Sequence, residues 1–211
     1  MDVVVVGTGG LAREFAAFFS DEVNIVGFSS ESSEEYSKFK LPDKFFEGDI
    51  TPELVGTRYA VLAIGSPITK EAVSKKLESA GFVFPNLAHS SSVLATDIQE
   101  LPDQGLIVSP NCVVGSDVSF GRHVYLNFMV GVGHDATFDD FVQINPGAQV
   151  GGAVSVGSRV LIGSGSSILQ GLKVRDSSTV GSGAVVFSSV RPGVTVVGNP
   201  AKRLKLPGFT D

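Results

Sequence analysis

One histidine in this chain has the neighbours that a general base needs. His134 is followed directly by Asp135, and a carboxylate beside an imidazole fixes the tautomer of the ring and stabilises its protonated form. Gly152 comes eighteen residues later, in a Gly151-Gly152 pair that leaves the backbone bare. If one coil of the chain spans that same separation, Gly152 lies above His134 and its N–H can donate to a developing oxyanion. The plainer alternatives are a solvated surface histidine and two glycines that only form a corner.

The other two histidines do not complete a metal site. His123 follows Arg122 and is interpreted as a surface residue, while His89 is expected to help tie two parts of the chain together. His123 and His134 are eleven residues apart, which is not a whole coil, so three histidines do not converge on a zinc ion. We therefore expect no metal.

A hexad repeat must position these residues. An apolar residue stands at every sixth position from Val108 to Val186, fourteen in all, and seven of these lead residues are followed at once by glycine. A second apolar or small residue comes four positions after each lead, from Cys112 to Val190. A fixed six-residue period predicts a parallel β-helix in which three hexads make one triangular coil. We expect the glycine after each lead to take a positive φ at a tight corner. A β-sandwich, the alternative, has no reason to keep this phase.

The first 86 residues are predicted to form a separate small α/β unit. The pattern predicts strands at 1–6, 23–28 and 59–64, helices at 11–19 and 68–80, and a polar stretch at 29–44 with a Ser/Glu-rich loop at 29–37. Strands that alternate with glycine turns and helices indicate a small Rossmann-like, doubly wound sheet.

The first of these glycine turns favours a nucleotide. Gly7-Thr8-Gly9-Gly10-Leu11-Ala12 follows a strand, and its backbone N–H groups and the helix N-terminus favour a phosphate or another anion. An NAD site also needs an acidic residue at the end of the second strand, but that strand ends in Ser29-Ser30. A half-site for a nucleotide or nucleotide-sugar therefore fits better than an NAD-dependent oxidoreductase. Gly65 is expected beside this turn, with Lys70 close enough to add a positive charge.

Composition excludes other classes of protein. A formal net charge of −6 argues against a nucleic-acid binder, and no apolar run approaches the ~20 residues of a membrane span. The single cysteine, Cys112, falls in an inward slot and makes no internal disulfide, which fits a reducing cytoplasm. Residues 201–211 are expected to leave the β-helix as a tail, which carries the basic residues Lys202, Arg203 and Lys205.

Together these features resemble the hexapeptide-repeat acyltransferases, and more closely the sialic acid O-acetyltransferase (NeuD-like) type. That group includes N-acetyltransferases that act on UDP- or GDP-linked 4-amino-sugars. The resemblance spans nearly the whole chain. The segments that carry it are Gly7–Gly10, Ala63–Gly65, Phe84–His89, Gly133–Asp135 and Gly198–Arg203.

The resemblance implies a left-handed coil and a homotrimer with acetyl-CoA between neighbouring prisms. It implies that His134 is the general base, that Asp135 raises its basicity and that the backbone of Gly152 binds the acetyl carbonyl. The residues that it assigns to the coenzyme are Gln143, Ser164, Ser182, Lys202 and Arg203, the two serines coming from the adjacent subunit. The residues that it assigns to the acceptor nucleotide are Gly9, Gly10, Leu11 and Gly65. Residues 1–86 are then the acceptor-binding domain, and residues 87–211 are the acyltransferase domain with its tail.

Our hypothesis is direct transfer from acetyl-CoA to the amino group of a nucleotide-linked amino-sugar. A covalent acyl-enzyme is not needed, because Cys112 faces the core. O-acetylation of a sugar hydroxyl, as on sialic acid, and a non-catalytic β-helix that binds a sugar are the alternatives. Ser29-Ser30 stands where relatives often have an Asp pair, and Gln143 where many have His, so the acceptor stays open.

Overall fold

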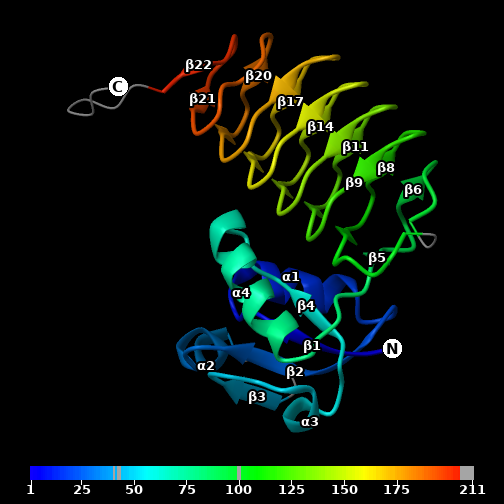
Figure 1. Cartoon of the computed structure of the whole chain (residues 1–211), viewed down its shortest axis with the longest axis vertical. Coiled ribbons are helices and arrows are strands. Elements are labelled where there is room, and N and C mark those ends of the chain that lie inside the picture. The colour runs from blue at the N-terminus through cyan, green and yellow to red at the C-terminus, as the bar shows by residue number, and fades with distance from the viewer. Residues whose placement is uncertain (40, 42–43, 99–100, 205–211) are drawn as a thin grey trace.

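The structure is a computed structural model that describes residues 1–39, 41, 44–98 and 101–204. The chain forms an N-terminal α/β unit and a stack of triangular coils (Figure 1). Lys205 and the rest of the predicted tail lie outside the described residues. No helix of the described part is both long enough and apolar enough to span a membrane.

The N-terminal unit is built on one parallel sheet. Its strands β1 (Asp2–Val6), β2 (Asn24–Ser30), β3 (Lys44–Glu47) and β4 (Ala60–Leu62) lie in the order β3-β2-β1-β4. Its helices are α1 (Gly10–Phe18), α2 (Glu34–Phe39), α3 (Pro52–Val55) and α4 (Pro67–Ser79). The small parallel sheet predicted from the sequence is therefore present.

The valine run of β1 is buried on both faces of this sheet. Val3 and Val5 pack with Phe15 of α1, while Val4 and Val6 pack in a second cluster with Leu77 of α4. A strand that is covered on both faces does not alternate apolar and polar residues, so the uninterrupted run of valines predicted a buried strand. The Ser/Glu-rich loop predicted at 29–37 was wrong in part, because α2 begins at Glu34. That helix buries no residue, so it has no apolar period to reveal it.

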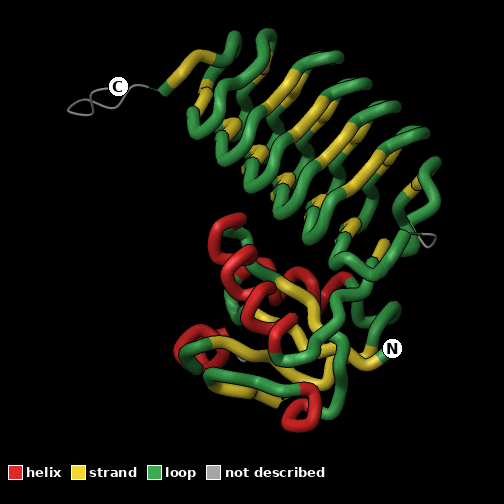
Figure 2. Tube along the Cα trace, in the orientation of Figure 1, coloured by secondary structure: helices red, strands yellow, loops and turns green. Residues whose placement is uncertain are grey.

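The coils contribute short strands, mostly of two residues, to three sheets that are parallel except where β22 pairs with β21 (Figure 2). The eight-stranded sheet holds β5 (Leu87–Ala88), β7 (Ile107–Val108), β10 (Tyr125–Leu126), β13 (Gln143–Ile144), β16 (Leu161–Ile162), β19 (Thr179–Val180), β21 (Thr195–Val197) and β22 (Lys202–Arg203). The six-stranded sheet holds β6 (Val93–Leu94), β8 (Val113–Val114), β11 (Gly131–Val132), β14 (Gln149–Val150), β17 (Ser167–Ile168) and β20 (Val185–Val186). The four-stranded solenoid sheet holds β9 (Ser119–Phe120), β12 (Thr137–Phe138), β15 (Ser155–Val156) and β18 (Lys173–Val174).

The core of the coils follows the hexad pattern. All fourteen lead residues from Val108 to Val186 are buried. The second inward set is buried as well, except for Leu172, which packs against the core while partly exposed. Paired strands join residues eighteen apart, as Tyr125 and Gln143 do, so the sequence period is one turn of the solenoid.

The glycines after the lead residues have a different role from the one predicted. Positive φ falls three residues after the lead, as at Asp135 and Ala153, and none of the seven glycines takes it. They are needed because the next coil is too close for a side chain. A Cβ on Gly121 would lie 2.6 Å from the carbonyl carbon of Asp139, and one on Gly133 would lie 2.5 Å from the nitrogen of Gly152. Contact between coils, not turn conformation, selects these glycines.

We therefore expect Gly121→Ala to lower the free energy of unfolding by roughly 1–3 kcal/mol, because backbone atoms must move to admit the methyl group. Chemical denaturation measures this loss. The matched control is Gly65→Ala, where an added Cβ meets nothing within 4 Å. Equal stability of the two variants would contradict the contact argument.

Helix α4 ties the N-terminal unit to successive coils. Lys70 Nζ donates to Gln143 Oε1 at 2.8 Å, and Arg159 Nη1 donates to Glu71 Oε2 at 3.4 Å. A third tie joins Glu78 to Arg122. Ile107 and Tyr125, on the outer face of the eight-stranded sheet, join the core cluster of α1. The two parts of the chain therefore share buried surface.

Candidate active site

His134 lies at the corner of the prism between β11 and β12. Its Nδ1 is 2.6 Å from Asp135 Oδ2, and the His134 side chain is 57% exposed. A carboxylate only accepts hydrogen bonds, so Nδ1 donates and Nε2 keeps its lone pair. In this tautomer an exposed imidazole can take a proton from a bound substrate.

The ring of His134 packs over the bare backbone of Gly152, one coil further along. A Cβ on Gly152 would lie 2.8 Å from His134 Nε2, so only glycine leaves the ring this position. Ala153 N donates to His134 O at 2.7 Å and fixes the stacking of the two coils. The N–H of Gly152 donates to no partner within the described ranges, although the residue is buried. The structure thus brings together the three residues that the sequence grouped.

The predicted coenzyme residues, Gln143 apart, gather at another corner, between the eight- and six-stranded sheets. Ser164 and Ser182 are exposed and one coil apart, with Gly183 N donating to Ser164 O at 2.9 Å. Val197 contacts Gly181, beside Ser182, and pairs with Lys202 across β21 and β22. Within one chain, Ser164, Ser182 and the basic strand β22 therefore lie at one corner of the prism, and His134 lies at another.

The predicted tail is wrong at its start. Lys202 and Arg203 form β22, which pairs antiparallel with β21, and Leu204 N donates to Thr195 O at 2.8 Å. Backbone pairing, which the sequence pattern after Val190 did not reveal, holds this segment on the last coil. Both basic side chains stay exposed.

Gln143 does not face a coenzyme. Its side chain is 1% exposed, and its Oε1 accepts the hydrogen bond from Lys70. Its Nε2 lies 3.4 Å from Asn145 Oδ1. The predicted contact with the thioester is therefore wrong for this conformation, because α4 covers the position. Gln143 instead joins the solenoid to α4.

Lys70 is also not where the sequence predicted it. The ammonium is fully buried, 5.3 Å from the centre of the Tyr125 ring, and has no carboxylate partner among the residues described. Burial lowers the pKa of Lys70 to about 7. Burial likewise lowers the pKa of the neighbouring His123 to about 3, helped by Arg122 and Lys70. His123 is a core residue stacked on Phe141, not a surface one.

Lys70 makes the stability of the protein depend on pH. The unfolded chain keeps this proton up to about pH 10.5, whereas the folded protein releases it near pH 7. Between these values the unfolded state binds more protons, so the free energy of unfolding rises with pH. We expect wild type to gain stability relative to Lys70→Met as the pH is raised from about 7 to about 10.

Urea unfolding at a series of pH values measures this difference. Lys75→Met is the matched control, since Lys75 lies on the same helix with its side chain 68% exposed, and it should follow wild type. Parallel curves for Lys70→Met and wild type would show that Lys70 is not a buried titrating group.

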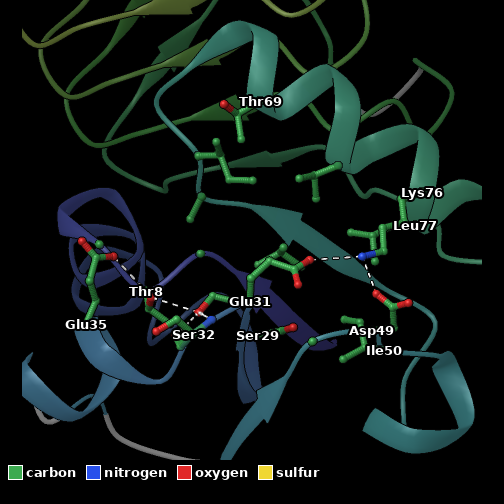
Figure 3. Close-up of a pocket in the computed structure, with 18 of the residues that line it drawn as sticks. Thr8, Ser29, Glu31, Ser32, Glu35, Asp49, Ile50, Thr69, Lys76 and Leu77 are labelled. Atoms are coloured by element: carbon green, nitrogen blue, oxygen red, sulfur yellow. Dashed lines mark hydrogen bonds and ion pairs between the residues drawn. The ribbon is translucent and has the colours of Figure 1, made fainter.

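A cavity of about 910 Å³ opens at the carboxyl ends of the N-terminal strands (Figure 3). The helices that follow β1 and β4 lie on opposite faces of the sheet. Ligands of open α/β sheets bind at such an edge, outside the carboxyl ends of the strands. The lining includes Gly7–Gly9 after β1, Ser29–Ser32 at the end of β2, Ala63–Ile64 after β4, and one face of α4. Of the predicted acceptor residues Gly9 lines the cavity, whereas Gly10, Leu11 and Gly65 are not part of its lining.

Two acidic residues lie near the end of the second strand, where the sequence showed only Ser29-Ser30. Glu31 directly follows β2, and Glu35 of α2 reaches back to the glycine turn, where its Oε2 accepts from Thr8 Oγ1 at 3.4 Å. Both line the cavity. Sequence reasoning missed them because the strand ends two residues later than predicted, at Ser30, and because α2 was unrecognised.

No group of three or more metal-ligating side chains lies close together in the described part of the chain. Cys112 is buried in the coil core, and burial raises the pKa of its thiol to about 11. A thiol in that position is not available as a nucleophile.

A three-sided parallel solenoid with an exposed histidine–aspartate pair at one corner, preceded by a small parallel sheet, is the arrangement that the resemblance to hexapeptide-repeat acyltransferases implies. Structural neighbours of this chain include a perosamine N-acetyltransferase and the acetyltransferase domain of PglB, which confirms the resemblance inferred from the sequence. No protein-family model and no curated protein matches the chain.

Three solved structures illustrate the similarity. The acetyltransferase domain of PglB from Neisseria gonorrhoeae FA1090, in complex with acetyl coenzyme A, is 28% identical, with a TM-score of 0.80 over 96% of this chain and 98% of that one. A histidine-to-asparagine mutant of perosamine N-acetyltransferase from Caulobacter crescentus, in complex with CoA and GDP-perosamine, is 23% identical, with a TM-score of 0.81 over 97% of both. WeeI from Acinetobacter baumannii AYE is 24% identical, with a TM-score of 0.75 over 97% of this chain and all of that one.

Proposed function

We propose that this protein is an acetyl-CoA-dependent acetyltransferase that acts on the amino group of a nucleotide-linked amino-sugar. The observation that carries the proposal is the exposed His134–Asp135 pair over the bare backbone of Gly152. Similarity over the whole chain to an acetyltransferase domain with bound acetyl coenzyme A supports it. The coils are proposed to be left-handed, as in that class, against the usual right-handed crossover.

The chemistry is a direct transfer. The acceptor nitrogen attacks the thioester carbon while His134 Nε2 takes the proton that the nitrogen loses. Gly152 N–H, which has no other partner in the described chain, donates to the oxyanion. Collapse of the tetrahedral intermediate breaks the C–S bond, and the thiolate of CoA leaves with the proton from His134. Asp135 holds the ring and stabilises its charged form between these two steps.

Removal of the base should spare binding and abolish turnover. We expect His134→Ala to lower kcat by ~10²–10⁴, because a positioned base contributes that much, and to keep the wild-type Kd for acetyl-CoA. Steady-state kinetics and calorimetry measure the two quantities. Turnover near that of wild type would refute the assignment of His134.

The base stability of the product and the binding of coenzyme A decide between the alternatives. An acetylated product that resists mild base is an amide, whereas a product that mild base cleaves is an ester and supports O-acetylation. A protein that binds no coenzyme A supports the non-catalytic sugar-binding module.

We further propose a homotrimer whose active sites lie between subunits. Ser164 and Ser182 share one corner of the prism and His134 occupies another, so a coenzyme held by both needs two chains. Residues 1–86 would bind the acceptor, and residues 87–211 would carry out the transfer. Acetyl-CoA as co-substrate and the buried, unpaired Cys112 fit a cytoplasmic location.

Mixed trimers test the shared site. His134→Ala loses the base, and Ser182→Trp blocks the coenzyme corner, so each variant alone should be inactive. Co-assembly of equal amounts should restore about a quarter of the wild-type sites, because each intact site then takes one sound corner from each chain. Activity assays of co-refolded mixtures measure this. No recovery in verified mixed trimers would place both corners of one chain in the same site.

A further inference from the structure

Lys70 begins a chain of three polar side chains that leads from helix α4 to the surface of the solenoid. Lys70 and Gln143 are each 1% exposed, and Lys70 Nζ donates to Gln143 Oε1 at 2.8 Å. Gln143 Nε2 in turn donates to Asn145 Oδ1 at 3.4 Å. Asn145 directly follows β13 and is half-buried. The chain of hydrogen bonds therefore starts in the interior and ends at the corner between the eight- and six-stranded sheets.

The ammonium at the buried end sets the direction of both hydrogen bonds. A lysine ammonium carries donors and no acceptor, so Gln143 must turn its amide oxygen toward Lys70 and its amide nitrogen toward Asn145. Asn145 then accepts through Oδ1, which leaves Nδ2 on the other side of its amide group. That nitrogen has no hydrogen-bond partner among the described residues. Lys70 thus fixes the orientation of two amides and leaves one N–H donor available.

The available donor of Asn145 lies at the corner to which the coenzyme serines belong. Strand β13 pairs with β16, so Asn145 lies one coil before Gly163, whose neighbour is Ser164. The coils stack in chain order (Figure 1), so along the solenoid axis Asn145 stands between the levels of His134 and Gly152. Prisms that lie side by side around a three-fold axis keep equivalent residues at equal heights. In the proposed homotrimer, a coenzyme that reaches His134 of one subunit therefore passes Asn145 of the next.

We propose that Lys70 is a positioning residue for the coenzyme: through Gln143 it holds Asn145 so that Nδ2 donates to a carbonyl oxygen of the pantetheine arm. That arm is uncharged and carries amide carbonyls, so a neutral N–H donor suits it. The assignment rests on the proposed function, because it specifies how the coenzyme of that reaction is held. An apolar side chain at position 70 would fill the same space but would leave the orientation of both amides unset.

Reversal of the last hydrogen bond tests the proposal while the contact with α4 is kept. In Gln143→Glu, one carboxylate oxygen still accepts from Lys70, but the other cannot donate, so Asn145 must turn Nδ2 inward and Oδ1 outward. We expect the Kd of coenzyme A to rise about tenfold, because a hydrogen bond is lost and an acceptor oxygen faces the carbonyl. The kcat for acetyl-CoA should stay near that of wild type, since the contact is made equally in the ground state and the transition state.

The effect of Lys70 itself is smaller and is measured by the same calorimetry. Lys70→Met leaves Gln143 free to take two amide orientations, and equal populations of the two would raise the Kd of coenzyme A about twofold. All titrations are made at pH 6, because burial lowers the pKa of Lys70 to about 7 and the wild-type ammonium must stay charged.

A double-mutant cycle separates positioning from a purely structural role. In an Asn145→Ala background, neither Gln143→Glu nor Lys70→Met should change the Kd of coenzyme A further, because the donor that they orient is already gone. Glu71→Gln is the matched control. It weakens the ion pair of α4 with Arg159, outside this chain of hydrogen bonds, and should keep the wild-type Kd.

Equal losses of affinity with and without the Asn145 side chain would show that Lys70 and Gln143 act only through the stability of the fold, which overturns the proposal. An unchanged Kd for Asn145→Ala would also overturn it, while the proposed transfer reaction would stand. Failure of the wild-type protein to bind coenzyme A would overturn both.

Discussion

The contact between successive coils is the constraint on which the rest of this molecule depends. Coils whose strands stack at the β spacing of ~4.8 Å leave no space for a side chain at several corners, so glycine recurs after the lead residues. The same spacing places equivalent residues directly above one another. Gly152 therefore lies over His134, and the imidazole packs on bare backbone whose N–H is free of partners in the described structure. A repeat selected for packing thus also builds the corner at which we propose that the transfer takes place.

Helix α4 joins the N-terminal unit to the coils of the solenoid. One face of the helix lines the cavity of the N-terminal unit, and the opposite face buries Lys70 against Gln143. An ammonium taken out of water costs free energy unless it is paired. This one has an amide oxygen and an aromatic ring beside it, and no carboxylate partner within the described residues. The buried ammonium lies at the contact between the N-terminal unit and the coils, where its hydrogen bond to Gln143 joins the two parts of the chain. The cavity is thereby held at a set position on the solenoid.

The sequence predicted what its periodicity encodes and missed what depends on tertiary contact. The hexads predicted every inward residue, and the eighteen-residue period paired His134 with Gly152. Lys70 was expected close to the glycine turn, because nothing local distinguishes a lysine that a distant coil will cover. Glu35 was missed because α2 has no buried face, and only folding returns it to the glycine turn. Gln143 was misassigned for the same reason as Lys70.

The most direct test of the central claim is the position of His134 in a complex. A crystal structure of the protein with coenzyme A and a nucleotide-linked amino-sugar gives the distance from His134 Nε2 to the acceptor nitrogen. The account predicts a hydrogen-bond distance, with the sulfur of the coenzyme beside Gly152 in a crevice between two subunits. A coenzyme bound away from this corner, or an acceptor nitrogen out of reach of the ring, would contradict it.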